Sequence, residues 1–195
     1  MKIVALLGSP RLNGNSAFLA NRFLETAKDR GADVRSFALN TLAYRGCQAC
    51  RGCKKTADTC ILKDDLTAVL DAVRDADIAV FATPVYFGDI SGQLKLFIDR
   101  TYCYLTPDFY TNPHGSRLSP GKQAVLILTQ GMADETAFAD VATRYEWILK
   151  LIGFATVHIF RGCNLAKPDD VQNQERLVKQ VEALAAEAVT PAEKQ

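Results

Sequence analysis

Residues 2–16 read KIVALLGSPRLNGNS, an apolar run followed by a polar loop that contains two glycines. The run at 2–7 has the length of a strand and is almost continuously apolar, which is typical of a parallel strand covered on both faces. A segment of helical period, 15–30, begins directly after the loop. This strand–loop–helix unit predicts the first half of a right-handed βαβ crossover.

The same alternation continues along the chain. Further strands are expected at 33–37, 78–82, 123–129 and 156–160, and further helices at 64–75, 91–104, 138–152 and 170–188. Five strands separated by helices predict an α/β fold with a doubly wound parallel sheet. A chain of 195 residues with 48% apolar and 23% charged residues fits one domain, expected over 1–189, with 190–195 as a disordered tail.

Charge and hydropathy exclude several classes of protein. Lys and Arg number 23 against 22 Asp and Glu, so the chain lacks the surplus positive charge that binding to nucleic acid requires. No apolar run approaches the roughly 18 residues of a membrane span. The apolar run before Gly8 is too short for a signal peptide. We therefore expect a cytoplasmic protein without nucleic-acid or membrane partners.

The loop 8–16 has the features of a phosphate site. It leads into a helix, whose first N–H groups and positive dipole end favour an anion, and Ser9, Asn13 and Ser16 add neutral hydrogen-bonding groups. The loop matches neither G-x-x-x-x-G-K-[ST] nor G-x-G-x-x-G, which disfavours a P-loop and a dinucleotide site. A single monophosphate fits better. The alternative is a polar turn that only caps the helix.

Two further segments carry a resemblance to a known family. The third strand leads into TPVYFGDISGQLK at 83–95, and FIDR follows at 97–100. Together with the first loop and the cysteine-rich segment ending in KDD at 63–65, the chain resembles the NADPH-dependent FMN reductases of the flavodoxin-like proteins. This resemblance implies a three-layer α/β/α fold around a five-stranded parallel sheet of order 2-1-3-4-5. The cofactor FMN would then lie beyond the carboxyl ends of strands one and three, where the order reverses.

The resemblance also implies the residues around FMN. At the phosphate it places Ser9, Arg11, Asn13, Asn15, Ser16 and Ala17; along the flavin ring Pro84, Val85, Tyr86, Phe87 and Gly88; and at a third edge Thr129, Gln130 and Gly131. The alternative for Tyr86 and Phe87 is packing under the next helix. No catalytic side chain is expected, because the flavin itself carries the redox chemistry.

Four of the six cysteines form the pattern C-x2-C-x2-C-x6-C, at Cys47, Cys50, Cys53 and Cys60. In a reducing cytosol, clustered thiols favour metal or redox chemistry over a disulfide framework. The triplet repeats the opening of the bacterial ferredoxin run. It is similar to the compact motif of the iron–sulfur flavoproteins, a branch of the same family, which implies a [4Fe–4S] cluster on these four residues. Zinc, a redox-active disulfide and free thiols remain open.

We therefore expect an FMN-dependent oxidoreductase that exchanges electrons with a small molecule or a protein and forms a homodimer or homotetramer. NAD(P)H is a candidate reductant, although nicotinamide stacked on a flavin leaves no fingerprint in the sequence. The alternatives are a clusterless NAD(P)H-dependent FMN or quinone reductase and a non-catalytic flavodoxin-like electron carrier.

Two segments lie outside the predicted strands and helices. One is the cysteine-rich insertion 45–63, and the other is the long loop 105–122, expected to cover the flavin or to join a subunit interface.

Overall fold

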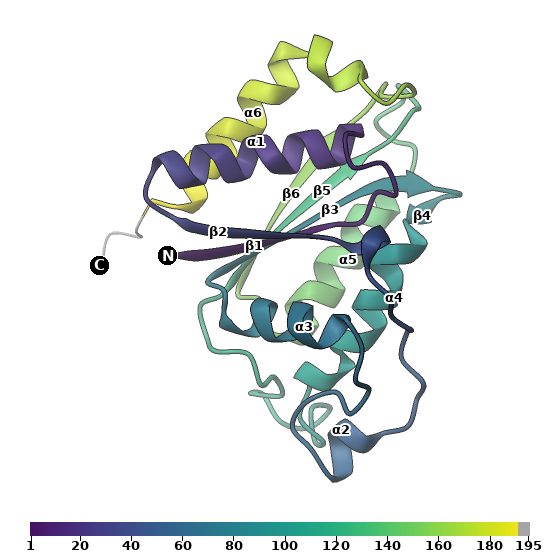
Figure 1. Ribbon diagram of the computed structural model, residues 1–195, viewed down its shortest axis with the longest axis vertical. Coiled ribbons are helices and arrows are strands. Elements are labelled where there is room, and N and C mark those ends of the chain that lie inside the picture. Colours follow the sequence, from purple (N-terminus) through teal and green to yellow (C-terminus); the bar gives the residue numbers. More distant parts are fainter. Residues whose placement is uncertain (191–195) are drawn as a thin grey trace.

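A computed structural model describes residues 1–190 and shows a parallel sheet between two layers of helices (Figure 1). Its parallel strands are β1 (Lys2–Leu7), β2 (Asp33–Ala38), β3 (Ile78–Tyr86), β5 (Gln123–Thr129) and β6 (Thr156–Gly162). They lie in the order β2-β1-β3-β5-β6, so the doubly wound sheet and the predicted order 2-1-3-4-5 of the parallel strands are confirmed. The expected tail falls largely on 191–195, which lie outside the described residues.

A sixth strand was not predicted. Strand β3 runs four residues past the expected end at Ala82, and β4 (Asp89–Ile90) pairs antiparallel with its last two residues. Phe87 and Gly88 connect them, both with positive φ, at 49° and 79°. A two-residue turn of this kind matches the right-handed twist of a hairpin. The predicted strand ended with the apolar run at Ala82, but β3 continues because β5 pairs with it as far as Pro84 and β4 pairs with Val85 and Tyr86.

The central strands β1, β3 and β5 are covered on both faces, as the apolar run at 2–7 predicted for β1. Helices α1 (Asn15–Asp29) and α6 (Glu175–Ala188) lie on one face, and α3 (Leu66–Asp75), α4 (Gly92–Arg100) and α5 (Ala139–Ile152) lie on the other (Figure 1). In β1, Ile3, Ala5 and Leu7 pack into the core beneath α1, and Val4 and Leu6 pack into the opposite core. Alternate residues of one buried strand thus stabilise both layers.

Two helices differ from the prediction at their ends. The segment expected as one helix over 170–188 is a short turn, η3 (Asp170–Asn173), followed by α6. The chain departs from helical geometry at Gln174, with φ −110° and ψ 71°, and within η3 the Val171 N–H donates to the side chain of Asn15, 3.1 Å away. The helix expected to reach 104 ends at Arg100, where the tighter turn η2 (Thr101–Tyr104) takes over. Among the described residues, no helix combines the length and apolar character needed to cross a bilayer.

The long loop 105–122 packs against the end of α5. Ser116 Oγ donates to the carbonyl oxygen of Ile152 at 2.7 Å, and a hollow of about 310 Å³ lies between the loop and Lys150–Gly153. Because α5 ends just before β6 begins, this is the amino edge of the sheet. Within one chain the loop therefore does not cover the loops that follow β1 and β3, which lie at the carboxyl edge.

Candidate functional site

The polar loop 8–16 and the turn after β3 meet at the carboxyl edge of the sheet. β1 and β3 are neighbours, and the N–H of Gly8 donates to the carbonyl oxygen of Ala82 at 2.8 Å. The Ser91 hydroxyl donates to the Gly8 carbonyl at 2.7 Å, and the Ser91 N–H donates to Thr83 Oγ1 at 3.0 Å. A Cβ atom at Gly8 would lie 2.9 Å from Ser91 Oγ, so only glycine allows the two loops to approach this closely.

A pocket of about 120 Å³ lies between these loops. It is lined by Ser9, Arg11, Gly14, Asn15, Ser16, Pro84, Val85, Tyr86, Thr129, Gly131, Leu165, Ala166 and Pro168. Nine of these were predicted from the sequence, and they come from the ends of β1, β3 and β5. The structure thus places all three predicted groups of residues around one cavity at the point where the strand order reverses.

One end of the pocket is suited to an anion. Helix α1 begins at Asn15, and its N-cap, Gly14, supplies no side-chain acceptor, so the first-turn N–H groups remain available to a ligand. Ser9 and Ser16 are buried at 4% and 2% exposure beside them. The Arg11 N–H donates to Ser9 Oγ at 3.0 Å, which folds the loop back over the helix end.

The side chain of Asn15 forms hydrogen bonds that the sequence did not indicate. Its Nδ2 donates to the carbonyl oxygens of Leu165 and Lys167, at 3.2 and 2.6 Å, and its Oδ1 accepts from the N–H of Val171. It therefore holds the segment 165–171, whose Leu165, Ala166 and Pro168 form one wall of the pocket. Only the position of this segment after β6, at the same edge of the sheet, could have signalled its role.

Five predicted residues do not line the pocket. They are Asn13, Ala17, Phe87, Gly88 and Gln130. The Gln130 side chain instead donates to the carbonyl oxygens of Met132 and Asp134 and accepts from Arg161, so it shapes the loop after β5. Phe87 is fully exposed and Tyr86 is 43% exposed. Packing of these two aromatic rings under the next helix, the alternative for them, is therefore not what the structure shows.

The four clustered cysteines lie around a second, smaller cavity. Cys47 and Cys50 are exposed, Cys53 is buried and Cys60 is half-buried, and none forms a disulfide. All four line a cavity of about 20 Å³ that also contacts Cys103. Burial raises the pKa of the Cys53 thiol, the adjacent Lys54 ammonium opposes the rise, and the other three thiols add to it. The four sulfurs therefore lie close enough to influence one another.

The thiols, as they lie in the structure, do not form a metal site. Among residues 1–190, no three Cys, His, Asp or Glu side chains are arranged to hold a metal ion. The present cavity has room for about one water molecule, so the loop would have to open to admit a cluster.

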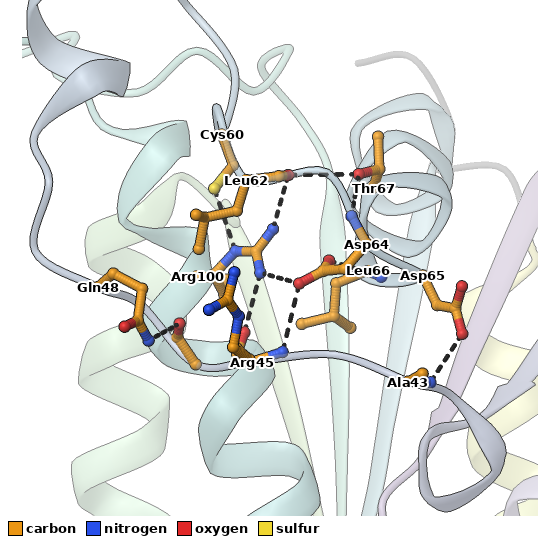
Figure 2. Close-up of polar contacts among 11 residues, drawn as sticks. Ala43, Arg45, Gln48, Cys60, Leu62, Asp64, Asp65, Leu66, Thr67 and Arg100 are labelled. Carbon is orange, nitrogen blue, oxygen red and sulfur yellow. Dashed lines mark hydrogen bonds and ion pairs between the residues drawn. The ribbon is translucent and has the colours of Figure 1, made fainter.

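The insertion that carries these cysteines is anchored to the end of α4 and to η2. The Lys54 ammonium donates to the carbonyl oxygens of Tyr102 and Leu105 and lies 4.1 Å from the centre of the Tyr102 ring. Arg100 donates to Cys60 Sγ at 3.1 Å (Figure 2). Cys103 is 2% exposed, and burial raises its pKa to about 11.

Comparison with known proteins identifies relatives of this chain. The sequence model of the family "NADPH-dependent FMN reductase" matches residues 1–157. The chain is 40% identical over 100 residues to "Iron-sulfur flavoprotein MJ0731" of Methanocaldococcus jannaschii, covering 51% of this chain and 50% of that one. It is 34% identical over 122 residues to "Iron-sulfur flavoprotein" of Methanosarcina thermophila, covering 62% and 63%. The chain thus spans about half to two thirds of the length of these curated relatives.

Solved structures share the fold. An NAD(P)H:quinone oxidoreductase from Methanothermobacter marburgensis superposes with a TM-score of 0.78 at 17% identity, covering 100% of this chain and 99% of that one. An FMN-dependent NADH-azoreductase from Bacillus anthracis, in complex with FMN, superposes with a TM-score of 0.73 at 16% identity, covering 97% and 100%. At such identities the likeness extends to the fold alone.

Proposed function

Since this chain belongs to the NADPH-dependent FMN reductase family, we propose that it is an FMN-dependent oxidoreductase that takes electrons from NAD(P)H and passes them to a small-molecule or protein acceptor. The observation that carries the proposal is the pocket at the reversal of strand order, formed by residues that follow β1, β3 and β5. FMN, when bound there, supplies the hydride chemistry, and the protein supplies its binding, orientation and electrostatic surroundings.

The loop 8–16 would hold the phosphate. The N-terminus of α1 lines the pocket through Asn15 and Ser16, and Ser9 and Ser16 are buried there. Arg11 is the positively charged side chain of the lining. A dianionic phosphate is stabilised by oriented N–H groups and a single cation without the lysine that a P-loop uses.

Pro84, Val85 and Tyr86 would contact the flavin ring. They form the end of β3: Pro84 is the last residue paired with β5, and the hairpin with β4 keeps Val85 and Tyr86 extended at the pocket edge. Gly131 contributes the opposite side, where a Cβ atom would lie 3.4 Å from Ala166. Tyr86 retains 43% exposure, so a planar ligand could cover its ring on the pocket side.

Anaerobic mixing of the FMN-loaded chain with NADPH or NADH tests the proposal. Bleaching of the flavin absorbance, and its return when a quinone is added, is the expected result. Ser16→Ala should weaken FMN binding about tenfold, whereas Ser36→Ala on the exposed strand β2 should leave it unchanged. A flavin that binds but is not reduced by either nucleotide would indicate an electron carrier instead.

We further propose that Cys47, Cys50, Cys53 and Cys60 hold a [4Fe–4S] cluster. The support is four free thiols around one cavity, and the iron–sulfur flavoproteins among the relatives. A cluster would supply single-electron transfer. Anaerobic purification followed by iron and sulfide analysis should find about four irons per chain, and Cys50→Ser should lower that number. Free thiols and no iron after anaerobic reconstitution would favour a clusterless reductase.

A further inference from the structure

Arg100 is the most deeply buried charged residue at the cysteine insertion. It ends α4 and is 1% exposed, with all three guanidinium nitrogens engaged (Figure 2). Nη1 donates to the carbonyl oxygen of Arg45 at 2.9 Å and to Asp64 Oδ2 at 2.8 Å, and Nη2 donates to the carbonyl oxygen of Leu62 at 3.2 Å. The fourth contact, from Nε to Cys60 Sγ, measures 3.1 Å.

These contacts join the two ends of the insertion 45–63. Arg45 stands at its beginning, and Cys60, Leu62 and Asp64 stand at or just after its end. The Asp64 carboxylate strengthens the junction, because it also accepts from the N–H of Arg45 at 3.3 Å and from the N–H of Leu66 at 3.1 Å. The buried guanidinium of Arg100 thus holds together the two ends of the segment that carries all four clustered cysteines.

Cys60 is the partner of the third guanidinium nitrogen. Asp64 and the two carbonyl oxygens accept from Nη1 and Nη2, so without Cys60 the buried Nε would lack its hydrogen-bond acceptor. A neutral thiol is a weak acceptor, whereas a thiolate accepts a charge-assisted hydrogen bond. The contact therefore places the buried guanidinium where a Cys60 thiolate bound to iron would accept a charge-assisted hydrogen bond.

We propose that Arg100 is a positioning residue for the [4Fe–4S] cluster. This inference rests on the cluster in the proposed function. Arg100 holds Cys60 toward the shared cavity while it keeps the ends of the insertion together. Hydrogen bonds to ligand sulfurs and nearby positive charge stabilise the more negative, reduced state of an iron–sulfur cluster. Arg100 should therefore raise both the retention of iron and the reduction potential.

The matched pair Arg100→Lys and Arg117→Lys tests this. Arg117 also donates to backbone oxygens in this region, those of Cys103 and Leu105, but contacts no clustered cysteine. Both variants and the wild type are reconstituted anaerobically, and FMN titration checks that each is folded. Arg100→Lys should lose about half its iron or more and shift the potential of the remaining cluster to more negative values. Arg117→Lys should match the wild type in both.

Two further measurements examine the contact of Arg100 with the cluster and its effect on the insertion separately. In wild-type protein labelled with ¹⁵N-arginine, pulsed EPR of the reduced cluster should show coupling to an arginine nitrogen. In the metal-free chain, amide hydrogen exchange within 46–61 should be about tenfold faster in Arg100→Lys than in the wild type. If the wild type binds no iron, the proposed cluster fails. If iron content and potential are unchanged in Arg100→Lys, or the nitrogen coupling or faster exchange is missing, the role of Arg100 is refuted.

Discussion

Ser91 and Gly8, 83 residues apart in the sequence, are joined by a hydrogen bond of 2.7 Å from the serine hydroxyl to the glycine carbonyl oxygen. The same hydroxyl accepts from the N–H of Leu94 and so caps α4. Ser91 is fully buried. One side chain therefore sets the separation between the loop proposed to bind phosphate and the turn proposed to contact the flavin ring.

Replacing Ser91 with alanine should weaken both the fold and the site. The variant loses a buried hydrogen bond and a helix cap, so its free energy of unfolding should fall by about 1–3 kcal/mol. FMN affinity should also fall, because the two loops are no longer tied. Urea unfolding and FMN fluorescence titration measure the two effects. Wild-type FMN affinity in Ser91→Ala would show that the bond does not set the pocket.

Asn15 should control the wall of the pocket rather than contact the phosphate through its side chain. Asn15→Ala removes three hydrogen bonds to the segment 165–171, so amide exchange there should accelerate and FMN binding should weaken. Asn15→Asp adds a negative charge beside the anion end and should weaken FMN more than it weakens riboflavin, which lacks the phosphate. Equal losses for the two flavins would contradict this arrangement.

Asp64 should make stability depend on acid pH. Burial alone would raise the pKa of this carboxyl, but hydrogen bonds from Arg100 and from the Arg45 N–H bring it below its ordinary 3.8. A lowered folded pKa contributes stability that is present above 3.8 and is lost as the pH falls through the lower folded value.

The variant Asp64→Asn isolates that contribution. It leaves the buried Arg100 without its anion, so it should be less stable than the wild type by roughly 3 kcal/mol at neutral pH. Urea unfolding over a pH series should show the gap narrowing as the pH falls below 3.8. A stability difference between the two proteins that stays constant down to pH ~2 would mean that the Asp64–Arg100 ion pair does not cause the pH dependence.

Thiol reactivity should separate the cysteines by burial. At pH ~8, alkylation followed by mass spectrometry should find the exposed Cys47 and Cys50 modified. Cys103 should stay unmodified in the folded chain, because it is buried and its pKa is raised to about 11. In protein loaded with iron, Cys47 and Cys50 should become protected, and removal of the iron by a chelator should restore their reactivity. Rapid modification of Cys103 would contradict its burial.

Much of the fold could be predicted because its signals are local. The apolar runs of β1, β3 and β5 and the helical segments between the strands predicted the doubly wound parallel sheet from general rules of βαβ folds, whereas its strand order came from the resemblance to the FMN reductases. β4 was missed because its turn places Phe87, a residue with a side chain, at positive φ, which local propensity disfavours. The break between η3 and α6 was missed because it lies at Gln174, where no glycine or proline marks it, and because η3 is held by a hydrogen bond to Asn15, 156 residues away from Val171.

The residues of the candidate site also divide into those with a local sequence pattern and those without one. The loops after β1 and β3 carry recognisable polar and glycine-containing patterns, and the structure brings most of their predicted residues to one pocket. The wall at 165–171 has no such pattern, since backbone groups held by Asn15 position it. The spacing of the four cysteines indicated a shared site, but not that a buried arginine at the end of α4 would bind the sulfur of Cys60.

Titration of the flavin-free chain with FMN and with riboflavin shows whether the pocket binds a flavin through its phosphate. One FMN should bind per chain, with its fluorescence quenched, and riboflavin should bind at least about tenfold more weakly because it has no phosphate for the loop at Ser9–Ser16 to hold. Equal affinity for the two flavins, or no binding of FMN by the folded chain, would contradict this binding through the phosphate.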